Sequence, residues 1–152
     1  EAGTPNIAQG VGLGAAVEFL NEIGLDIIEK KLIQLTQFAL EEMNKSSGIH
    51  LFHSGNPSEN VISFIVEGIH PQDLAMFMNE DNIAFRVGHH CAQPLMKHFG
   101  VSATARISFA VYNTQEDIKR FIQSLKNTVE ILKGHSNEKS ELKTKSIPEV
   151  VL

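Results

Sequence analysis

Apolar side chains recur at a period of about 3.6 residues between residues 7 and 23, which predicts a helix over 7–23. Glycines interrupt this stretch at every second position: Gly10, Gly12 and Gly14. Dinucleotide-binding loops also contain closely spaced glycines, but no strand precedes these three and the third is misplaced for that fingerprint. We therefore interpret them as positions where the helix packs closely against a neighbour.

A second amphipathic helix is predicted directly after the first. An apolar stripe with steps of three and four residues runs from Ile28 to Ala39. Asp26 and Glu29 have the spacing of a capping box, which places the start of this helix near them. Gly48 is the residue type that commonly ends a helix.

Short runs rich in β-branched and aromatic residues predict four strands. They cover 49–52, 61–66, 83–87 and 105–110. The run over 61–66 is almost continuously apolar, so we expect that strand to be buried on both faces.

Three further helices are predicted from their boundary residues. Pro71 suits the first turn of one helix, and Pro94 opens a short helix that ends at Gly100. Thr114 is expected to cap the last helix, whose apolar face continues as far as Leu132.

This order mixes helices and strands too closely for a strictly alternating fold. We predict an α+β domain over 1–134, with a small, mainly antiparallel sheet covered by helices. After Gly134 the sequence becomes polar, so residues 135–152 are predicted to form a C-terminal tail. The tail ends in an apolar segment, 147–152, which we expect to dock on its own domain or on a partner.

Composition narrows the class of protein. The chain has 152 residues, 42% of them apolar, and a net charge of −5, which fits one packed domain and argues against a nucleic-acid-binding surface. No apolar run is long enough to span a membrane. A single cysteine cannot form an internal disulfide, so a reducing, cytoplasmic setting is expected. The first residue is Glu1, and we expect the chain to be a piece of a longer protein.

The residues around Cys91 carry the candidate chemistry. Cysteine is a nucleophile as the thiolate, which nearby positive charge or a helix start favours, and Arg86, His89 and His90 stand close by in the sequence. On spacing alone a structural cysteine is slightly favoured over a reactive one. Adjacent residues rarely point at one ion and a structural zinc site usually needs four ligands, so we expect no metal site.

A resemblance to a known family sharpens this interpretation. Residues 86–96 read RVGHHCAQPLM and resemble the active-cysteine segment of group II cysteine desulfurases, the branch of the class V aminotransferase superfamily that includes selenocysteine lyases. The segments EAGTPN at 1–6 and ARISFAVYNT at 105–114 agree with it. The resemblance runs to about residue 134. It implies the C-terminal small domain of a fold type I enzyme, with 1–25 including part of an inter-domain and dimer-interface helix region.

The resemblance also implies roles for individual residues. Cys91 would take sulfur from L-cysteine and become a persulfide, with L-alanine as the second product. Arg106 matches the arginine that binds the substrate carboxylate, and its planar guanidinium suits that task. Arg86 lies beside the same site and is expected to steer the cysteine loop or the substrate.

Cofactor and partners follow from the same resemblance. The cofactor is pyridoxal 5′-phosphate, held mainly by a large domain that this chain lacks, so the chain alone is expected to be inactive. Thr4 matches a threonine that contacts the cofactor phosphate across a homodimer interface. His89 and His90 are expected to shape the loop or support the thiolate. A sulfur-acceptor protein of iron–sulfur cluster assembly is the expected partner, without nucleic acid or membrane.

Two other functions stay open at this point. The parent protein could be a selenocysteine lyase, or the chain could be a non-catalytic interaction or dimerisation module. A thiol-based redox sensor is a weaker possibility, because no second cysteine is present to resolve an oxidised Cys91.

Overall fold

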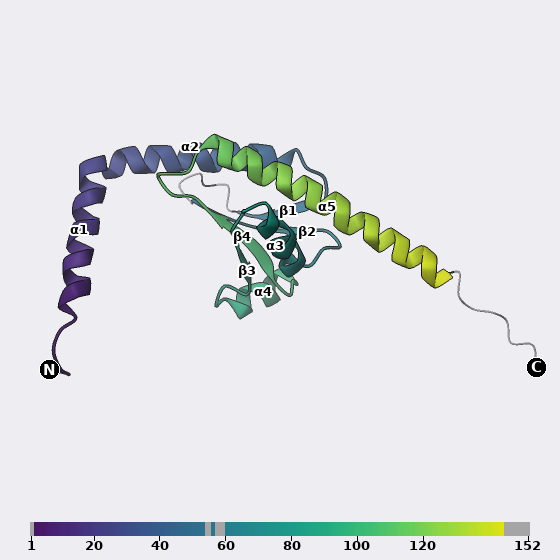
Figure 1. The fold of residues 1–152 in the computed structure, drawn as a ribbon, viewed down its shortest axis with the longest axis horizontal. Coiled ribbons are helices and arrows are strands. Elements are labelled where there is room, and N and C mark those ends of the chain that lie inside the picture. Colours follow the sequence, from purple (N-terminus) through teal and green to yellow (C-terminus); the bar gives the residue numbers. More distant parts are fainter. Residues whose placement is uncertain (1, 54–55, 57–59, 145–152) are drawn as a thin grey trace, which may run out of the picture.

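The computed structural model describes residues 2–53, 56 and 60–144, and for 135–144 it describes the backbone alone. Within these residues five helices and four strands follow one another (Figure 1). Their bounds, in chain order, are α1 Ile7–Ile23, α2 Leu25–Asn44, β1 Ile49–Phe52, β2 Val61–Val66, α3 Pro71–Glu80, β3 Arg86–Gly88, α4 Gln93–Phe99, β4 Thr104–Ser108 and α5 Gln115–Thr144.

The four strands form one sheet in the order β1-β2-β4-β3. Each neighbouring pair is antiparallel. Helices α2 and α5 lie side by side over one face of this sheet, and α3 packs against α5 (Figure 1). The predicted α+β fold with a small antiparallel sheet covered by helices is therefore confirmed.

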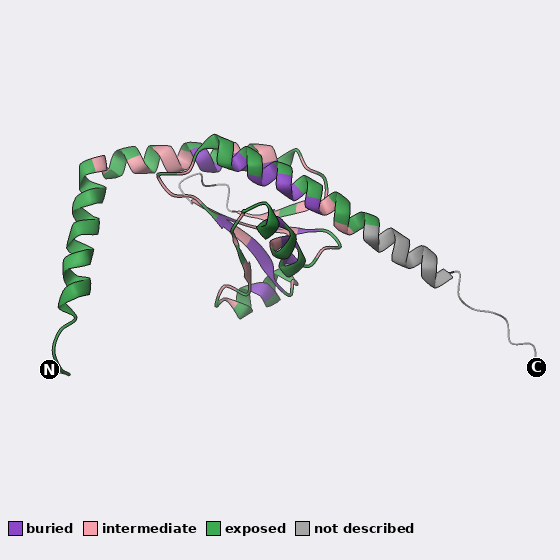
Figure 2. Cartoon of the chain, viewed as in Figure 1, coloured by how far each residue is buried: buried purple, intermediate pink, exposed green. Residues whose placement is uncertain are grey.

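The hydrophobic core lies between these helices and the inner face of the sheet (Figure 2). Phe64 of β2 is its centre, with ring centroids 6.2 Å from Phe85 and 6.0 Å from Phe121 of α5. Burial alternates along β2, so that Phe64 is fully buried whereas Ser63 and Ile65 are partly exposed. The expectation that this strand is buried on both faces is wrong, because its alternate residues, on the face that α2 and α5 do not cover, are only partly buried.

Several predicted boundaries agree with the structure and two strands differ. Helix α1 and strands β1 and β2 have the predicted bounds. Strand β3 begins only at Arg86, because the Ile83 N–H donates to the Met78 carbonyl at the end of α3 and Phe85 packs into the core. Strand β4 ends at Ser108, two residues early, because the Ala110 N–H turns to the Asn113 side chain at 2.8 Å.

The start and end of α2 also depart from the prediction. Its N-cap is Gly24, no side chain bonds to the cap, and Asp26 lies within the first turn, so the predicted capping box is wrong. The helix ends at Asn44, before the predicted stop. Gly48 adopts a left-handed φ of 78° in the turn into β1, a conformation that glycine reaches without strain.

Helix α1 stands away from the sheet, and none of its residues is buried (Figure 2). A Cβ added at any of its three alternating glycines would meet no atom within 4 Å apart from its chain neighbours and the backbone of its own helix. Close packing at the glycines is therefore not made by the described part of the chain. Ile7 and Val11 are 68% and 70% exposed, so α1 presents apolar surface without a partner there.

Helix α5 continues through Gly134 to Thr144, so the first ten residues of the predicted tail prolong this helix. The apolar segment 147–152, which we expect to dock, lies outside the described residues. None of the helices in the described part of the chain is long and apolar enough to cross a membrane.

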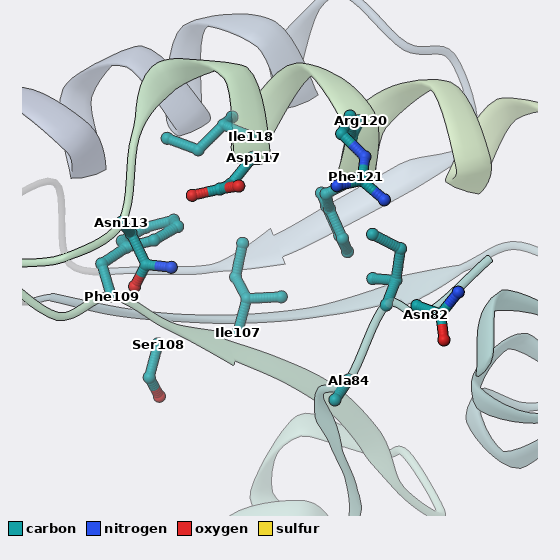
Figure 3. Close-up of a pocket in the computed structure, with 11 residues that line it drawn as sticks. Asn82, Ala84, Ile107, Ser108, Phe109, Asn113, Asp117, Ile118, Arg120 and Phe121 are labelled. Atoms are coloured by element: carbon teal, nitrogen blue, oxygen red, sulfur yellow. The ribbon is translucent and has the colours of Figure 1, made fainter.

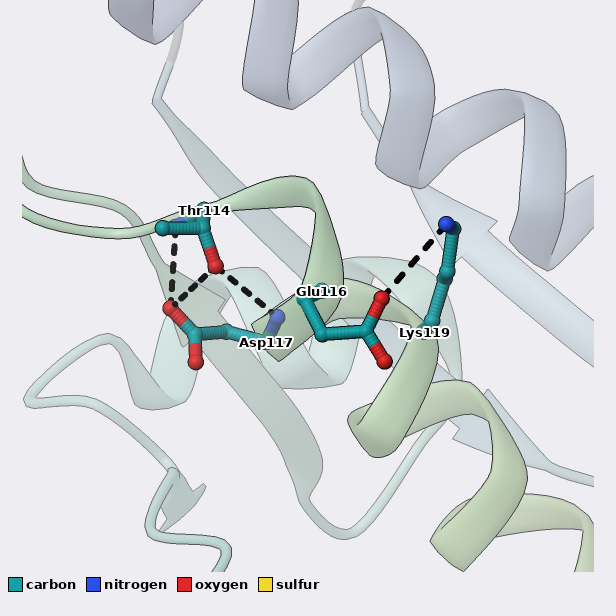
Figure 4. Close-up of polar contacts among 4 residues, drawn as sticks. All are labelled: Thr114, Glu116, Asp117 and Lys119. Carbon is teal, nitrogen blue, oxygen red and sulfur yellow. Dashed lines mark hydrogen bonds and ion pairs between the residues drawn. The ribbon is translucent and has the colours of Figure 1, made fainter.

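The start of α5 carries the predicted cap at Thr114 (Figure 4). The Asp117 N–H donates to the Thr114 hydroxyl at 3.2 Å, and the Thr114 N–H donates to the Asp117 carboxylate at 2.9 Å. This reciprocal pair is a capping box with aspartate in the third helical position. The backbone N–H of Thr114, the largest cause, and its hydroxyl lower the pKa of Asp117 below its ordinary value. The exposed Glu116–Lys119 ion pair at 3.5 Å adds little.

We expect Thr114→Ala to lower the free energy of unfolding by about 1 kcal/mol, because the first turn of α5 loses its cap. Thr114→Ser retains a capping hydroxyl and should unfold like the native chain in a urea titration. The hydrogen bonds from Thr114 to the Asp117 carboxylate lower the folded pKa of Asp117. The stabilisation by these bonds is therefore present at neutral pH and is lost as the pH falls through the lowered pKa. Equal stability of the alanine and serine variants at neutral pH would show that the cap contributes nothing.

Candidate active site

The sheet turns its second face away from α2 and α5, and the strand register places polar side chains there. Arg106 of β4 lies opposite Arg86 of β3 on one side and opposite Ser63 of β2 on the other. Directly opposed residues of an antiparallel pair point to the same side of the sheet, and residues two apart on one strand share that side. Thr104 therefore joins this set, which we call the open face: Ser63, Arg86, Thr104 and Arg106.

Two arginines directly opposite each other are the unusual feature of the open face. Like charges in such a pair are destabilising unless an anion lies between or beside them. Arg106 is partly buried, and its Nε is shielded from solvent without a hydrogen-bond partner among the described residues. Arg86 is exposed. The pair is thus suited to receive a carboxylate, which a guanidinium binds through two parallel hydrogen bonds.

Cys91 lies in a tight turn between β3 and α4. The Ala92 N–H donates to the His89 carbonyl at 2.8 Å and closes the turn. The two central residues, His90 and Cys91, have left-handed φ values of 54° and 58°, as in a type I′ turn. This conformation costs roughly 1–2 kcal/mol for each residue that is not glycine. Cys91 is exposed at this turn, where a substrate or a partner protein can reach its sulfur.

The side chain of His90 ties the turn to the sheet. Its Nε2 lies 3.1 Å from the Thr104 carbonyl oxygen and 3.0 Å from the Thr104 hydroxyl. A carbonyl only accepts, so this contact assigns the proton of the neutral ring to Nε2. Burial, the largest cause, lowers the pKa of His90, and the charges of Arg106 and Arg86 lower it further, although the Thr104 carbonyl acts in the opposite direction. A charged His90 that supports the thiolate, as considered from the sequence, is therefore disfavoured.

A cavity of about 460 Å³ adjoins this part of the sheet. Phe52 of β1 and Phe99 of α4 form one wall, with ring centroids 4.7 Å apart. Ser63 and Thr104 of the open face contribute polar groups to it. This cavity therefore has an apolar side and a polar side.

A second cavity, of about 230 Å³, lies between α5 and the end of β4 (Figure 3). Asp117 and Arg120 approach it from α5, while Ile107 and Phe109 approach it from β4 and the residue that follows. None of the residues that the sequence singles out lines either cavity. The larger cavity is lined by Ser63 and Thr104 of the open face, whereas none of the four residues of that face lines the second one. The open face is therefore the better candidate for chemistry.

The structure brings together most of the residues that the sequence singles out. Arg86 and Arg106 are cross-strand partners, and His90 and Cys91 share the neighbouring turn. His89 begins that turn and is exposed. Thr4 is exposed and precedes α1, the helix that stands away from the sheet (Figure 1). The described residues contain no group of three or more histidine, cysteine, aspartate or glutamate side chains that could hold a metal ion.

Sequence analysis missed Thr104, which anchors His90. Its position two residues before Arg106, in a strand that alternates polar and apolar side chains, is the signal that could have found it. The predicted strand begins at residue 105, so the alternation includes Thr104 only when the strand is extended by one residue.

Comparison with known proteins gives consistent matches. The family model described as Aminotransferase class-V matches residues 1–121. A "Probable cysteine desulfurase" of Halalkalibacterium halodurans is 47% identical over 135 residues, which cover 89% of this chain and 33% of that protein. The crystal structure of the cysteine desulfurase CsdA (S-sulfonic acid) from Escherichia coli has a TM-score of 0.81 at 35% identity and covers 86% of this chain and 32% of its own. The apo structure of the cysteine desulfurase of Thermococcus onnurineus has a TM-score of 0.80 at 36% identity, and the match covers 86% of this chain and 33% of that one. The chain thus spans about a third of the length of these relatives.

We expect the His90 ring to carry its proton on Nε2 and to titrate below the ordinary value of 6.5. Nitrogen–carbon correlation NMR of the histidine rings measures both properties. A folded pKa below the unfolded one means that the unfolded chain binds more protons, so stability falls as the pH drops from about 6.5 through the folded value. His90→Gln should remove this part of the pH dependence. A titration midpoint above 6.5, or a proton on Nδ1, would contradict the assigned environment.

Proposed function

The chain belongs to the class V aminotransferase family, and we propose on that premise that it is the part of a cysteine desulfurase that supplies the sulfur-accepting thiol and binds the substrate carboxylate. Its similarity to two cysteine desulfurase structures and to a curated relative of that name supports the proposal. The segment around Cys91 further supports the group II branch of these enzymes.

One observation carries this function: an arginine pair lies on one face of the sheet, and an exposed cysteine lies in the turn that follows the strand of Arg86. L-cysteine has a carboxylate at one end and a sulfur at the other. Arg106 would hold the carboxylate, and Arg86, opposite it, would complete the positive end of the site. Cys91, in the neighbouring turn, would then meet the substrate sulfur.

The proposed sulfur transfer balances without an oxidant or a reductant. The Cys91 thiolate attacks the sulfur of L-cysteine, a sulfur–sulfur bond forms, and the substrate carbon–sulfur bond breaks. The electron pair of the broken bond stays on the substrate carbon, which then takes up a proton. L-cysteine and the Cys91 thiol thus become L-alanine and a Cys91 persulfide, a reversible sulfur carrier.

We propose that the described residues do not by themselves build a site for pyridoxal phosphate. No lysine lies on the open face or lines the cavity beside it, within the described residues. Thr4 is exposed and lies just before the N-terminal end of α1. In the proposal, the cofactor is held mainly by parts of the protein beyond this chain, where it serves as an electron sink next to the substrate nitrogen. The chain alone is accordingly proposed to be inactive.

The segment around Thr4 is where we propose that this chain contacts the rest of the protein and a second copy. Residues 1–25 are proposed to form part of an inter-domain and homodimer-interface region, with Thr4 contacting the cofactor phosphate of the second copy. The exposed apolar side chains of α1, including Ile7 and Val11, support burial of this helix against such partners. Residues 1–134 remain the proposed domain and 135–152 the proposed tail.

A persulfide on Cys91 must be passed on to be useful. Exposure of Cys91 supports transfer to a sulfur-acceptor protein, which we propose to serve iron–sulfur cluster assembly in the cytoplasm. His89, which is also exposed and begins the turn, is proposed to shape this surface.

We expect Cys91→Ser, made in the full-length protein, to abolish release of L-alanine from L-cysteine, because serine cannot accept the sulfur. Mass spectrometry should find one added sulfur atom on Cys91 in the native protein after a single turnover with L-cysteine. Retained alanine release in the variant, with the cofactor still bound, would refute the role of Cys91. Turnover of selenocysteine with none of cysteine would identify a selenocysteine lyase instead.

In the full-length protein, Arg106→Lys should lower kcat/KM for L-cysteine by roughly 10- to 100-fold, mainly through a higher KM. Lysine retains the charge but loses the second parallel hydrogen bond, and a hydrogen bond to a charged group contributes about 1.5–3 kcal/mol. Arg120→Lys, at an exposed position of α5, is the matched control and should leave both constants unchanged. An unchanged KM in Arg106→Lys would show that this arginine does not bind the carboxylate.

A further inference from the structure

We propose that His90 is a positioning residue whose side-chain contact with Thr104 holds the turn of Cys91 in fixed geometry relative to Arg106. The inference deepens the proposed function on which it rests. Through this contact, the residue that attacks sulfur and the residue that binds the carboxylate belong to one rigid unit. Neither His90 nor Thr104 needs to touch the substrate for this.

The turn requires support from outside its own backbone. Type I′ turns favour Asn-Gly, because both central residues need a positive φ. Here the central residues are His90 and Cys91, with φ of 54° and 58°. Histidine adopts this region more often than most residues do, but it is uncommon for any residue except glycine. A single backbone hydrogen bond, from the Ala92 N–H to the His89 carbonyl, closes the turn. Strained backbone of this kind persists only where the surrounding structure holds it.

Thr104 is a rigid anchor for that purpose. It is 1% exposed and begins β4, the strand that pairs with both β2 and β3. Its partner across the ladder is Gly88, the last residue of β3 before the turn. The His90 ring therefore reaches from the turn back to the strand on which the turn depends.

The contact also joins the two halves of the proposed site. His90 immediately precedes Cys91, and Thr104 stands two residues before Arg106 on the same face of β4. A shift of the turn by one ångström would change the distance between the nucleophile and the clamped substrate. Displacements of that size can cost about 100-fold in rate.

The ring makes this contact through one atom, which permits a sharp test. Nε2 bonds to Thr104, while Nδ1 is buried without a partner among the described residues. The amide nitrogen of glutamine lies about where Nε2 lies, and that of asparagine lies about where Nδ1 lies. Asparagine, however, adopts a left-handed φ more readily than glutamine does. His90→Gln therefore keeps the side-chain contact but has the poorer backbone preference, whereas His90→Asn loses the contact and has the better backbone preference.

The experiment measures kcat and KM for L-cysteine in the full-length His90→Gln and His90→Asn proteins. If the contact holds the turn, His90→Gln keeps kcat within about threefold, whereas His90→Asn loses about 10- to 100-fold. KM should change by less than about threefold in both, because Arg106 is untouched. Equal kcat values for the two variants, or a higher one for His90→Asn, would overturn the inference.

Two matched controls separate this role from general damage to the fold. His70→Asn makes the same substitution at an exposed helix cap, which asparagine also fills well, and should leave kcat unchanged.

Thr104→Val tests the other partner of the contact. It removes the hydroxyl but not the carbonyl, so it should lower kcat less than His90→Asn does. Thr36→Val removes a buried hydroxyl that bonds to no described residue, and it should have no effect. The same kcat for Thr104→Val and Thr36→Val would refute a contribution from the Thr104 hydroxyl.

Crystal structures of the two His90 variants give a readout that does not depend on activity. We expect residues 90 and 91 to keep positive φ values in His90→Gln and at least one to lose it in His90→Asn. If the native protein releases no alanine, the proposed function fails while this comparison still decides the role of the contact. If the native protein is active and both variants keep the turn, the inference alone fails.

Discussion

The alternation of side chains along β4 is the constraint on which the rest of this molecule depends. Ala105 and Ile107 enter the core beneath α2 and α5, while Thr104 and Arg106 point to the open face. A register shift of one residue would bury Arg106 and expose Ile107. Burying one large aliphatic side chain is worth about 1.5–3 kcal/mol, so packing on one face fixes the placement of the guanidinium on the other. Stability and the candidate chemistry are thus set by the same ladder of hydrogen bonds.

Hydrophobic periodicity was enough to predict most of the scaffold. The bounds of α1, β1 and β2 follow from it, because their local preferences agree with their environment. It failed for the segment before Arg86, where Phe85 is apolar because it fills the core and not because it belongs to the sheet. The capping-box spacing also failed at α2, where Gly24 takes the cap position that Asp26 was expected to mark.

The candidate site was harder to predict than the fold. The motif around Cys91 pointed to the residue, but nothing in a His-Cys pair indicates a left-handed turn. The contact that explains the turn joins His90 and Thr104, which are 14 positions apart and meet only once β3 and β4 are paired. The pairing of Arg86 with Arg106 has the same origin. These features follow from register, which depends on the packing of the whole sheet and not on a local sequence pattern.

The exposed turn makes the molecule convenient for spectroscopy. Cys91 is the single cysteine of the sequence and stands open to solvent. A maleimide fluorophore or a nitroxide spin label added to this chain would consequently attach at one known position, without prior removal of competing thiols. The label would report on the motion of a tight turn between a strand and a helix whose resting φ angles are known. Loop dynamics, which are usually inferred indirectly, could then be recorded from a single probe.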